Sequence, residues 1–583
     1  MGRISVWFWC FSAVAAPVVS KVEPPNWWAG SSYSTVHLLV HGSGLHDLDV
    51  HGERGIEILN SHPNEAGTYL FIDVKVHKPG TFNIKLSNPE GSAKAAFEVL
   101  NPLAPKGRFQ GFSNDDLIYM LMPDRFADGD ESNDKGDRKA PRDYHGGDFQ
   151  GIIDHLDYLK GLGITALWIT PIYRNETEYH GYHAVDFYGI EQHFGTLDKF
   201  RELVDKAHQS GIKVILDMVM NHTGPKHPWV NDPPMDDWFH GTPEHHLNES
   251  FQIWTLLDPH SGPTLRDPVL DGWFGNNLPD LNQNEPRVAE YLIQNTLWWI
   301  ASTGIDGVRA DTMPYVPRKF WHDWNAAIHN EYPDFKTVGE AFDTDPSVVA
   351  LFQGGVKKYD GIDSGMDAMF DFPTYGAIRR VFAGTKAVPD LPYIIAHDSL
   401  YSSPNDLVTF LGNHDVARFM SEPGATIEGL KLAFAYLFTV RGIPMIYYGD
   451  EIGLRGGNDP ENRADFPGGW KDDPGNAFDA ATRTAEERDI FDYVHNLALI
   501  RQQTPDLRRG KFTQIGLGHD ILVYTRGALI VLLNNGPNAV KAEVPATPGT
   551  WKDLLNAATN VAVHDRVMTV TVPPHTAMIM SKR

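Results

Sequence analysis

Both ends of the chain alternate hydrophobic and polar residues in short runs separated by turn-forming residues. Near the N-terminus the runs include YSTVHLLVHG and TYLFIDVKV, and from about residue 509 they include ILVYTR and VMTVTV. Successive side chains of a β-strand point to opposite faces, so this period of two is typical of half-buried strands. The pattern predicts an antiparallel β-sandwich domain over residues 21–108 and a second one over residues 506–583.

The stretch between these ends has a different pattern, in which apolar runs alternate with amphipathic segments such as FRELVDKAHQSG. Eight such strand–helix units predict an α/β fold, a (β/α)8 TIM barrel over residues 109–505. The longest gap, residues 222–285, follows the third strand and predicts a small inserted domain. The eight candidate strands lie in residues 116–126, 164–171, 212–222, 305–312, 335–342, 365–373, 407–415 and 443–451.

Composition and charge narrow the class of protein. Hydrophobic residues make up 42% of the 583 residues, which is enough for several large cores. The net charge of −25 opposes binding to nucleic acid or to an anionic membrane surface. A neutral substrate is compatible with this charge. The 15 Trp, 21 Tyr and 30 Phe are expected mostly in cores, but their flat apolar faces also suit sugar rings.

The first 20 residues, MGRISVWFWCFSAVAAPVVS, resemble a short secretory signal. One Arg precedes an apolar run, and Ala13-Val14-Ala15 is a candidate cleavage motif, so we expect a periplasmic or secreted protein. A buried strand or an incorrect start are the alternatives. The run is too short to span a membrane comfortably. It contains the only cysteine, Cys10, so disulfides are not expected to hold the mature fold together.

Polar residues gather where the candidate strands end. They are Asp217, Asn221 and His222 in the third strand segment, Arg309 and Asp311 in the fourth, Glu340 in the fifth, and His414 and Asp415 in the seventh. The carboxyl ends of all barrel strands meet at one rim, which carries the active site. The barrel is therefore expected to bring together three acids, Asp311, Glu340 and Asp415.

Arg309 lies two residues before Asp311, so the two side chains leave the strand on the same face. An adjacent cation favours the ionised form of a carboxyl group. The spacing therefore predicts that Arg309 keeps Asp311 charged for chemistry, and a purely structural ion pair at the rim is the alternative.

Four of these strand ends carry motifs in a recognisable order. DMVMNH (217–222), GIDGVRADT (304–312), VGEAF (338–342) and FLGNHD (410–415) resemble the four signature regions of the α-amylase family of glycoside hydrolases. LPDLNQ (278–283) is similar to an additional family region. The resemblance covers roughly residues 110–500, and a β domain after the barrel is also usual in the family.

The resemblance and the chemistry of the residues imply a retaining glycosidase, which needs a nucleophile and an acid/base about 5 Å apart. Asp311 is the expected nucleophile. Glu340 is the expected acid/base, with a pKa raised by burial and by neighbouring carboxylates. By resemblance, Asp415 binds sugar hydroxyls and stabilises the oxocarbenium-like transition state. All three acids are present, which argues against a non-catalytic glucan-binding protein.

The same resemblance assigns sugar-binding roles at the cleavage site. His222 and His414 are expected to hydrogen-bond sugar hydroxyls, although a lone histidine is more often structural. Tyr182, in YHGYHAVDFYGI, matches a stacking aromatic residue. Asp217 is expected to support the site through hydrogen bonds rather than to react.

Oxygen-bearing side chains crowd the segment DRFADGDESND (124–134) and the following HGGDFQG (145–151). Ca²⁺ takes six to eight oxygen ligands, often from such loops. The alternative is a solvated acidic loop. Similar loops bind structural calcium in cyclodextrin-acting members of the family, with a backbone carbonyl at the position of Gly146. The candidate ligands are Asp128, Asp130, Asn133, Asp134, Gly146 and Asp148. A second calcium site involving Asn221 and Asp280 has weaker support.

Other tracts resemble bacterial cyclomaltodextrinases and neopullulanase-type enzymes. They are EPPNWWAG (23–30), GFSNDDLIYMLMPDRFADGD (111–130) and DFPGGWKDDPGNAF (465–478). The resemblance implies hydrolysis of cyclodextrins and short maltooligosaccharides. Neopullulanase, α-amylase, α-glucosidase and transglycosylase activities remain alternatives, and the oligomeric state is open. Trp27 and Trp28 are expected to dock the N-terminal domain on the barrel, with a sugar platform as the alternative.

One departure from that subgroup stands out. Many dimeric cyclomaltodextrinases continue from the nucleophile with Val-Ala-Asn-Glu, whereas this chain continues with Thr312-Met313-Pro314-Tyr315. The missing glutamate puts in doubt the subsite preferences, the transglycosylation and the dimer associated with that tract.

Overall fold

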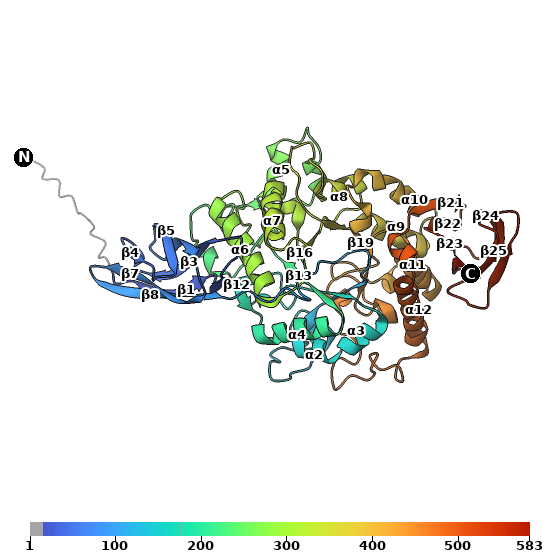
Figure 1. The fold of residues 1–583 in the computed structure, drawn as a ribbon, viewed down its shortest axis with the longest axis horizontal. Helices are drawn as coiled ribbons and strands as arrows, with labels where there is room; N and C mark the ends of the chain where they lie inside the picture. Colours follow the sequence, from blue (N-terminus) through green and yellow to red (C-terminus); the bar gives the residue numbers. More distant parts are fainter. Residues whose placement is uncertain (1–14, 176–177) are drawn as a thin grey trace, which may run out of the picture.

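The computed structural model describes residues 15–175 and 178–583. Figure 1 shows three parts along the long axis: N-terminal sheets at one end, a helix-covered barrel in the middle and C-terminal sheets at the other end. Most of the predicted signal peptide (1–20), including Cys10 and its cleavage motif up to Val14, lies outside the described residues. The first strand begins at Val18, three residues before the expected start of the N-terminal domain at residue 21.

The N-terminal part consists of two four-stranded sheets, with strand orders β1-β3-β6-β5 and β2-β8-β7-β4. Val36, Ile72, Ile84 and Phe97 are buried in its core, as the predicted alternation requires. The strands are β1 (Val18–Glu23), β2 (Asn26–Trp28), β3 (Thr35–Ser43), β4 (Asp49–His51), β5 (Ile56–Pro63), β6 (Tyr69–Val76), β7 (Gly80–Asn88) and β8 (Gly91–Leu100).

The central part is a closed barrel of eight parallel strands in the order β10-β13-β16-β17-β18-β19-β20-β9. The predicted TIM barrel is therefore confirmed, and each of its strands lies within one of the eight candidate segments. The strands are β9 (Ile118–Leu121), β10 (Ala166–Ile169), β13 (Lys213–Met218), β16 (Gly307–Ala310), β17 (Lys336–Gly339), β18 (Ala368–Phe370), β19 (Leu407–Phe410) and β20 (Ile443–Tyr447).

Helices surround this barrel. The main ones are α2 (Phe149–Asp154), α3 (Leu156–Leu162), α4 (Leu197–Gln209), α6 (Pro286–Thr303), α7 (Arg318–Glu331), α8 (Pro346–Phe352), α9 (Phe372–Phe382), α10 (Asp390–Ile395), α11 (Ile427–Thr439) and α12 (Ala485–Gln503). The shorter ones are α1 (Pro123–Phe126), α13 (Pro505–Arg509) and the 3-10 turns η3 (Met313–Tyr315), η4 (Ala396–Leu400), η5 (Pro404–Asp406), η6 (Phe419–Ser421), η7 (Asp450–Ile452) and η8 (Glu461–Arg463).

Helix α6 shows how local sequence places the candidate chemistry. Pro286 occupies its first turn, where a missing backbone N–H costs nothing. The helix ends at Gly304, whose φ of +74° is the left-handed cap that glycine adopts without strain. The chain then enters β16 within three residues, which carries Arg309 to the rim.

The longest insertion in the barrel lies between β13 and α6, as predicted. It contains little regular structure and rises above the barrel in Figure 1, where α5 is labelled. Its elements are η1 (Pro228–Val230), β14 (Leu247–Asn248), η2 (Ile253–Leu256), α5 (Pro263–Leu270) and β15 (Gly272–Trp273). A hairpin of β11 (Tyr173–Asn175) and β12 (Ala184–Ile190) follows β10.

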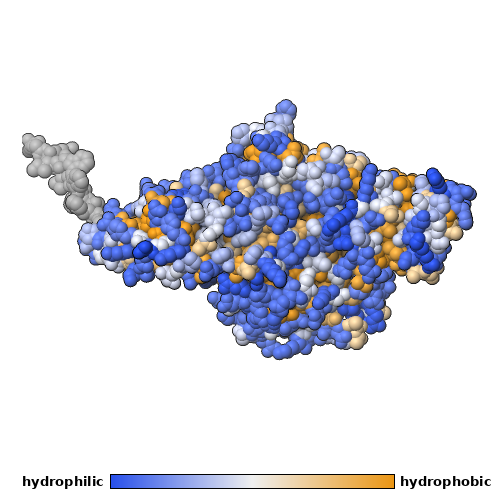
Figure 2. Space-filling view, viewed as in Figure 1, coloured by the Kyte–Doolittle hydropathy of each residue, from blue (hydrophilic) through white to orange (hydrophobic). Residues whose placement is uncertain are grey.

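The C-terminal part pairs a six-stranded sheet, β21-β22-β23-β28-β25-β26, with the two strands β24 and β27. Its strands are β21 (Phe512–Leu517), β22 (Ile521–Arg526), β23 (Leu529–Asn534), β24 (Val540–Pro545), β25 (Gly549–Asp553), β26 (Asn560–Val563), β27 (Val567–Val572) and β28 (Thr576–Lys582). The face of the molecule in Figure 2 is mostly hydrophilic, with hydrophobic residues in separate patches. Among the described residues, every helix is too short or too polar to cross a membrane.

Candidate active site

Strand register places two of the three predicted acids side by side. Ala310 of β16 pairs with Gly339 of β17, so Asp311 and Glu340 are the next residues on adjacent parallel strands. The Glu340 N–H donates to the carbonyl of Ala310 at 3.1 Å, which continues the ladder by one step. Neighbouring strands lie about 4.8 Å apart. The register therefore places Asp311 and Glu340 at the same level of the rim, one strand apart.

Arg309 binds both of these acids and a third carboxylate. Its Nη1 lies 2.5 Å from Asp311 Oδ1 and 2.9 Å from Asp217 Oδ1, and its Nη2 lies 2.7 Å from Glu340 Oε1. The guanidinium is 1% exposed. Burial by itself lowers its pKa, but the charges of the neighbouring carboxylates, Asp217 first, outweigh this and raise the pKa further above its already high value. Asp217 also accepts from Tyr182 Oη at 2.8 Å and Trp168 Nε1 at 3.2 Å. Arg309 thus organises the site as well as balancing its charge.

Glu340 is buried at the base of the cleft. Burial raises its pKa to about 8, and the negative charges of Asp311 and Asp415 add to the shift, while Arg309 opposes it. The backbone N–H of Thr312 donates to Glu340 Oε2 at 3.0 Å. A carboxyl group in this environment holds its proton at a pH where a surface glutamate is ionised. It is therefore suited to protonate a leaving group.

A cleft of about 580 Å³ opens above these carboxyls, and all three predicted acids line it. Its walls differ in character. His414 and Arg463 lie beside Asp415, whereas His222 stacks on Phe274. The lining residues are His180, Tyr182, His183, His222, Phe251, Phe274, Leu278, Asp311, Thr312, Pro314, Tyr315, Glu340, Phe342, His414, Asp415 and Arg463.

The predicted sugar-binding side chains converge on this cleft. Tyr182 and His414 stack with ring centroids 5.2 Å apart and planes 4° apart. His222 Nε2 lies 3.2 Å from the carbonyl oxygen of Tyr182. Burial lowers the pKa of both histidines, and for His414 the charges of Arg463 and Arg309 lower it further. Neutral imidazoles can both donate to and accept from sugar hydroxyls.

The sequence interpretation did not single out Arg463 as part of the cleft. This residue comes from the loop after β20, where Nη2 lies 3.4 Å from Asp415 Oδ1 and Nε donates to the carbonyl of His414 at 2.9 Å. Its Nη1 also contacts the hydroxyl of Tyr179 at 3.3 Å. The one available signal was an arginine in a loop that follows a barrel strand, which is weak because such residues are common.

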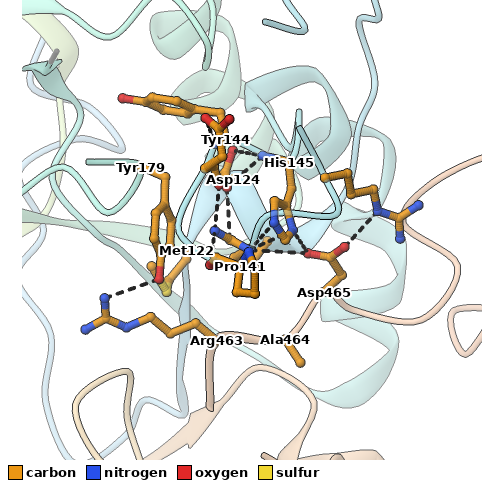
Figure 3. A network of polar contacts seen from close by, with 12 residues as sticks. Met122, Asp124, Pro141, Tyr144, His145, Tyr179, Arg463, Ala464 and Asp465 are labelled. Atoms are coloured by element: carbon orange, nitrogen blue, oxygen red, sulfur yellow. Dashed lines mark hydrogen bonds and ion pairs between the residues drawn. The ribbon is translucent and has the colours of Figure 1, made fainter. Parts of the chain in front are cut away.

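Figure 3 shows how that contact joins a larger network beneath the first βα loop. The guanidinium of Arg125 stacks on the ring of Tyr179, with Cζ 3.8 Å from the ring centroid. The carboxylate of Asp124 accepts from the backbone N–H of His145 at 2.9 Å, and His145 Nδ1 lies 2.6 Å from Asp465 Oδ1. The network ties the loop that holds Gly146 to the wall of the cleft.

The predicted calcium ligands lie in the loop between β9 and α2. Asp148 caps α2 by accepting from the Gly151 N–H at 2.7 Å, and its other oxygen accepts from Asn133 Nδ2 at 3.1 Å. Two buried acceptors, Asp128 Oδ1 and Asn133 Oδ1, find no donor among the described residues. Burial and then Asp134 and Asp148 raise the pKa of Asp128 to about 6. Orphaned oxygens and mutual repulsion of this kind fit a bound cation.

Two other predicted calcium ligands, Asp134 and Asp130, lie in different environments. Asp134 is close to Gly146, where an added Cβ would meet Asp134 Oδ1 at 2.4 Å. Asp130 is exposed, and its Oδ1 accepts from the hydroxyl of Ser132 at 2.6 Å. In the described part of the chain, no three Asp, Glu, His or Cys side chains converge into a ready-made metal cluster. A calcium ion here would therefore depend on amide and backbone oxygens as well.

The second suggested calcium site is only partly consistent with the structure. The amide group of Asn221 faces the carbonyl of Tyr315 and Asp280 Oδ1, each at 3.2 Å. With the amide turned over, its nitrogen donates to both of these oxygens and its oxygen accepts from His222 Nδ1 at 3.2 Å. Asp280 Oδ2 is already paired with His240 Nδ1 at 2.7 Å, so one of its oxygens is occupied.

Comparison with known proteins agrees with this geometry. The model of the α-amylase catalytic domain matches residues 120–510, about two thirds of the chain. The chain belongs to the α-amylase family of glycoside hydrolases. The model of the cyclomaltodextrinase N-terminal domain matches residues 21–101. Both the fold and the enzyme class predicted from the four motifs are therefore confirmed.

Among its relatives, a β/α-amylase of Paenibacillus polymyxa is 33% identical over 80% of this chain, which spans only 38% of that protein. A cyclomaltodextrinase of Geobacillus thermopakistaniensis is 30% identical over 79% of this chain and 76% of its own length. The solved α-amylase of Anoxybacillus superimposes with a TM-score of 0.70 at 35% identity, covering 81% of this chain and 98% of that one. These relatives support hydrolysis of α-glucans.

Proposed function

We propose that this protein hydrolyses α-1,4-glucosidic bonds in cyclodextrins and short maltooligosaccharides with retention of configuration. The observation that carries the proposal is the pair Asp311 and Glu340, in register on adjacent strands and bound to one guanidinium. Retaining glycosidases need their two carboxyls about 5 Å apart. The N-terminal domain match and the cyclomaltodextrinase relative support the choice of substrate.

The reaction would proceed in two steps. In the first, an Asp311 oxygen attacks the anomeric carbon while protonated Glu340 gives its proton to the departing glycosidic oxygen. The C–O bond to the leaving sugar breaks and a glycosyl–Asp311 ester forms. In the second step, ionised Glu340 takes a proton from water, whose oxygen attacks the same carbon and releases Asp311.

Neighbouring groups would hold the sugar through both steps. Arg309 remains paired with the Asp311 carboxylate. Asp415 is open to the cleft, where its carboxylate would accept from sugar hydroxyls and stabilise positive charge on the ring. His222 and His414 would bind hydroxyls, and Tyr182 would stack on the ring at the cleavage site.

An α-amylase acting on linear glucans is the second candidate. The Anoxybacillus α-amylase is matched over 98% of its length. Tyr315 stands where many dimeric cyclomaltodextrinases carry a glutamate, and it lines the cleft. The deciding measurement compares initial kcat/KM on β-cyclodextrin, maltoheptaose, soluble starch and pullulan with one enzyme preparation. Preference for the ring over starch supports the proposal, and preference for starch supports the second candidate.

Replacing Asp311 with Asn tests the nucleophile. The variant D311N should lose kcat by several orders of magnitude, because an amide cannot form the glycosyl ester. Its thermal unfolding should still be cooperative. D198N, at an exposed helix position, is the control and should keep full activity. Near-normal turnover by D311N would exclude Asp311 as the nucleophile.

Retention of configuration has its own test. NMR of the first products from maltoheptaose, recorded before mutarotation, should show the α-anomer at the newly formed reducing end. An initial β-anomer would mean inversion, and Glu340 and Asp311 would then need different roles.

Calcium is proposed as a structural ion of the first βα loop. Asp128, Asn133, Asp134 and Asp148 would hold it, with the carbonyl of Gly146 as a further ligand by family resemblance. The ion would supply positive charge that relieves the repulsion among these carboxylates. No predicted ligand belongs to the catalytic trio, so the ion would stabilise the loop rather than react.

A further inference from the structure

Thr312, directly after the proposed nucleophile, contacts both catalytic carboxyls. Its hydroxyl donates to Asp311 Oδ2 at 3.0 Å, and its backbone N–H donates to Glu340 Oε2 at 3.0 Å. Arg309 binds the opposite oxygen of each acid. Each carboxyl group is therefore held on one side by the arginine and on the other by this threonine.

The backbone conformation of Thr312 makes the double contact possible. In an extended strand the side chains of residues 311 and 312 would point to opposite faces. Thr312 instead has φ +46° and ψ +39°, in the left-handed region. This conformation is strained for a β-branched residue and is found where surrounding structure enforces it. The turn ends β16, starts η3 and brings the hydroxyl back toward Asp311.

Packing around this turn holds it in place. The N–H of Met313 donates to the carbonyl of Glu340 at 3.1 Å, and Trp321 Nε1 donates to the carbonyl of Met313 at 2.9 Å. Gly339 lies so close that an added Cβ would meet Met313 Sδ at 2.4 Å. Thr312 itself is 8% exposed and lines the floor of the cleft.

We propose that Thr312 is a positioning residue that sets the spacing and charge of the two reacting carboxyls. Its hydroxyl stabilises the ionised form of Asp311, and its N–H fixes the orientation of Glu340. The inference rests on the proposed function, because it takes these two acids as nucleophile and acid/base.

The two contacts come from different atoms, so substitution separates them. T312V removes the hydroxyl and keeps the shape and the N–H, whereas T312S keeps both donors. T312G removes the hydroxyl together with the side-chain strain, which guards against a T312V protein that fails to fold. T409V is the matched control, because Thr409 is a buried barrel-strand threonine whose hydroxyl has no partner among the described residues.

In T312V and T312G we expect kcat to fall about tenfold with KM within about twofold. The acidic limb of the kcat/KM pH profile should move to higher pH, because a hydrogen bond to the ionised nucleophile is lost. The basic limb should stay in place, since the N–H to Glu340 remains. T312S and T409V should match the wild type in both limbs.

Several outcomes would overturn the proposal. One is an unchanged acidic limb in folded T312V or T312G, and another is equal loss in T312S and T312V. A fall in melting temperature without a shift of the limb would mean that Thr312 is only structural. Activity of D311N reports separately on the proposed function: if D311N is active, the catalytic assignment fails whatever Thr312 does.

Discussion

Glu340 occupies an environment that favours its protonated form, although an arginine nitrogen lies 2.7 Å from one of its oxygens. Burial is the dominant cause, because the ionised group would lose its hydration in the floor of the cleft. Asp311 lies in the same pocket but has Arg309 and the Thr312 hydroxyl as partners. The two carboxyls thus differ in the Thr312 group that they meet, a hydroxyl for Asp311 and a backbone N–H for Glu340.

The raised pKa of Glu340 predicts the alkaline side of the activity profile. The protein needs this group protonated to begin the reaction, so kcat/KM should fall as pH rises past a value near 8. E340Q should lose this dependence along with most of its activity on substrates with poor leaving groups. A basic limb that persists unchanged in residual E340Q activity would assign the titration to another group.

The same shift predicts a dependence of stability on pH. The folded-state pKa of Glu340 lies above its ordinary value of 4.5, so between about pH 4.5 and 8 the folded state holds a proton that the unfolded state has released. The free energy of unfolding should therefore fall as pH rises through this range, by about 1.4 kcal/mol per pH unit at most. Urea unfolding of wild type and E340Q at pH 5 and pH 8 checks this. A fall of equal size in both proteins would contradict it.

Contacts between individual residues could be predicted from the sequence where both residues lie on the same strand. Arg309 and Asp311 could be paired because alternation along β16 puts both on one face. The contact of Thr312 with Asp311 could not be predicted this way. It depends on a left-handed backbone conformation at Thr312, for which the neighbouring residues give no sequence signal. Arg463 was missed because its contact with Asp415 joins two loops distant in the sequence.

At the scale of elements, a bound calcium ion would stabilise the loop between β9 and α2. Asp148 anchors the start of α2, and Asp124 holds the backbone at His145 and Gly146. Arg125 binds the carbonyl of Asp143 in this loop and lies over the ring of Tyr179. The hydroxyl of Tyr179 contacts Arg463 in the cleft wall (Figure 3). A loosened loop would thus weaken the support of Arg463.

The structure sharpens the test of calcium in this loop. EDTA should lower the melting temperature of the wild type by several degrees, and added Ca²⁺ should restore it. D128N should lose this response, because Asp128 has a buried oxygen without a donor. D130N should keep it, because Asp130 is exposed and bonded to Ser132. Equal responses of wild type and D128N would place calcium elsewhere or exclude it.

Barrel strands were predictable from the sequence because each is a short buried run ending in polar residues, as in β13 and β19. The hairpin of β11 and β12 was not. It carries Tyr182 close to Asp217 only through contacts with β13 and with the segment after β19. Such long-range packing leaves no periodic signal in the hairpin itself.

At the scale of the whole molecule, the N-terminal sheets dock firmly on the barrel. Trp27 is 1% exposed and Trp28 is 6% exposed, and both line a small crevice shared with Leu297 of α6 and Tyr332 at the end of α7. Their burial favours the docking role over a sugar platform. Arg287 of α6 adds a two-pronged ion pair with Asp73 of β6, at 2.6 and 3.1 Å.

Breaking that ion pair should destabilise the protein without changing its chemistry. R287M should lower the free energy of unfolding by about 1–2 kcal/mol, because a partly buried carboxylate loses its partner. The value of kcat/KM on the preferred glucan should stay unchanged. K319M, which removes an exposed pair with Asp323, is the control and should have almost no effect on stability. Altered kcat/KM in folded R287M would give the N-terminal part a role in the site.

The pairing of β9 with β20 has a consequence for biosynthesis. Ile118, near the start of the barrel, lies beside Met445 of its last strand. The N-terminal sheets are complete once residue 100 has left the ribosome, whereas the barrel cannot close until β20 has followed. At ordinary rates of translation that interval lasts on the order of tens of seconds. During this interval the growing chain exposes two unpaired strand edges. Protection from aggregation at this stage therefore depends on chaperones and not on the stability of the closed barrel.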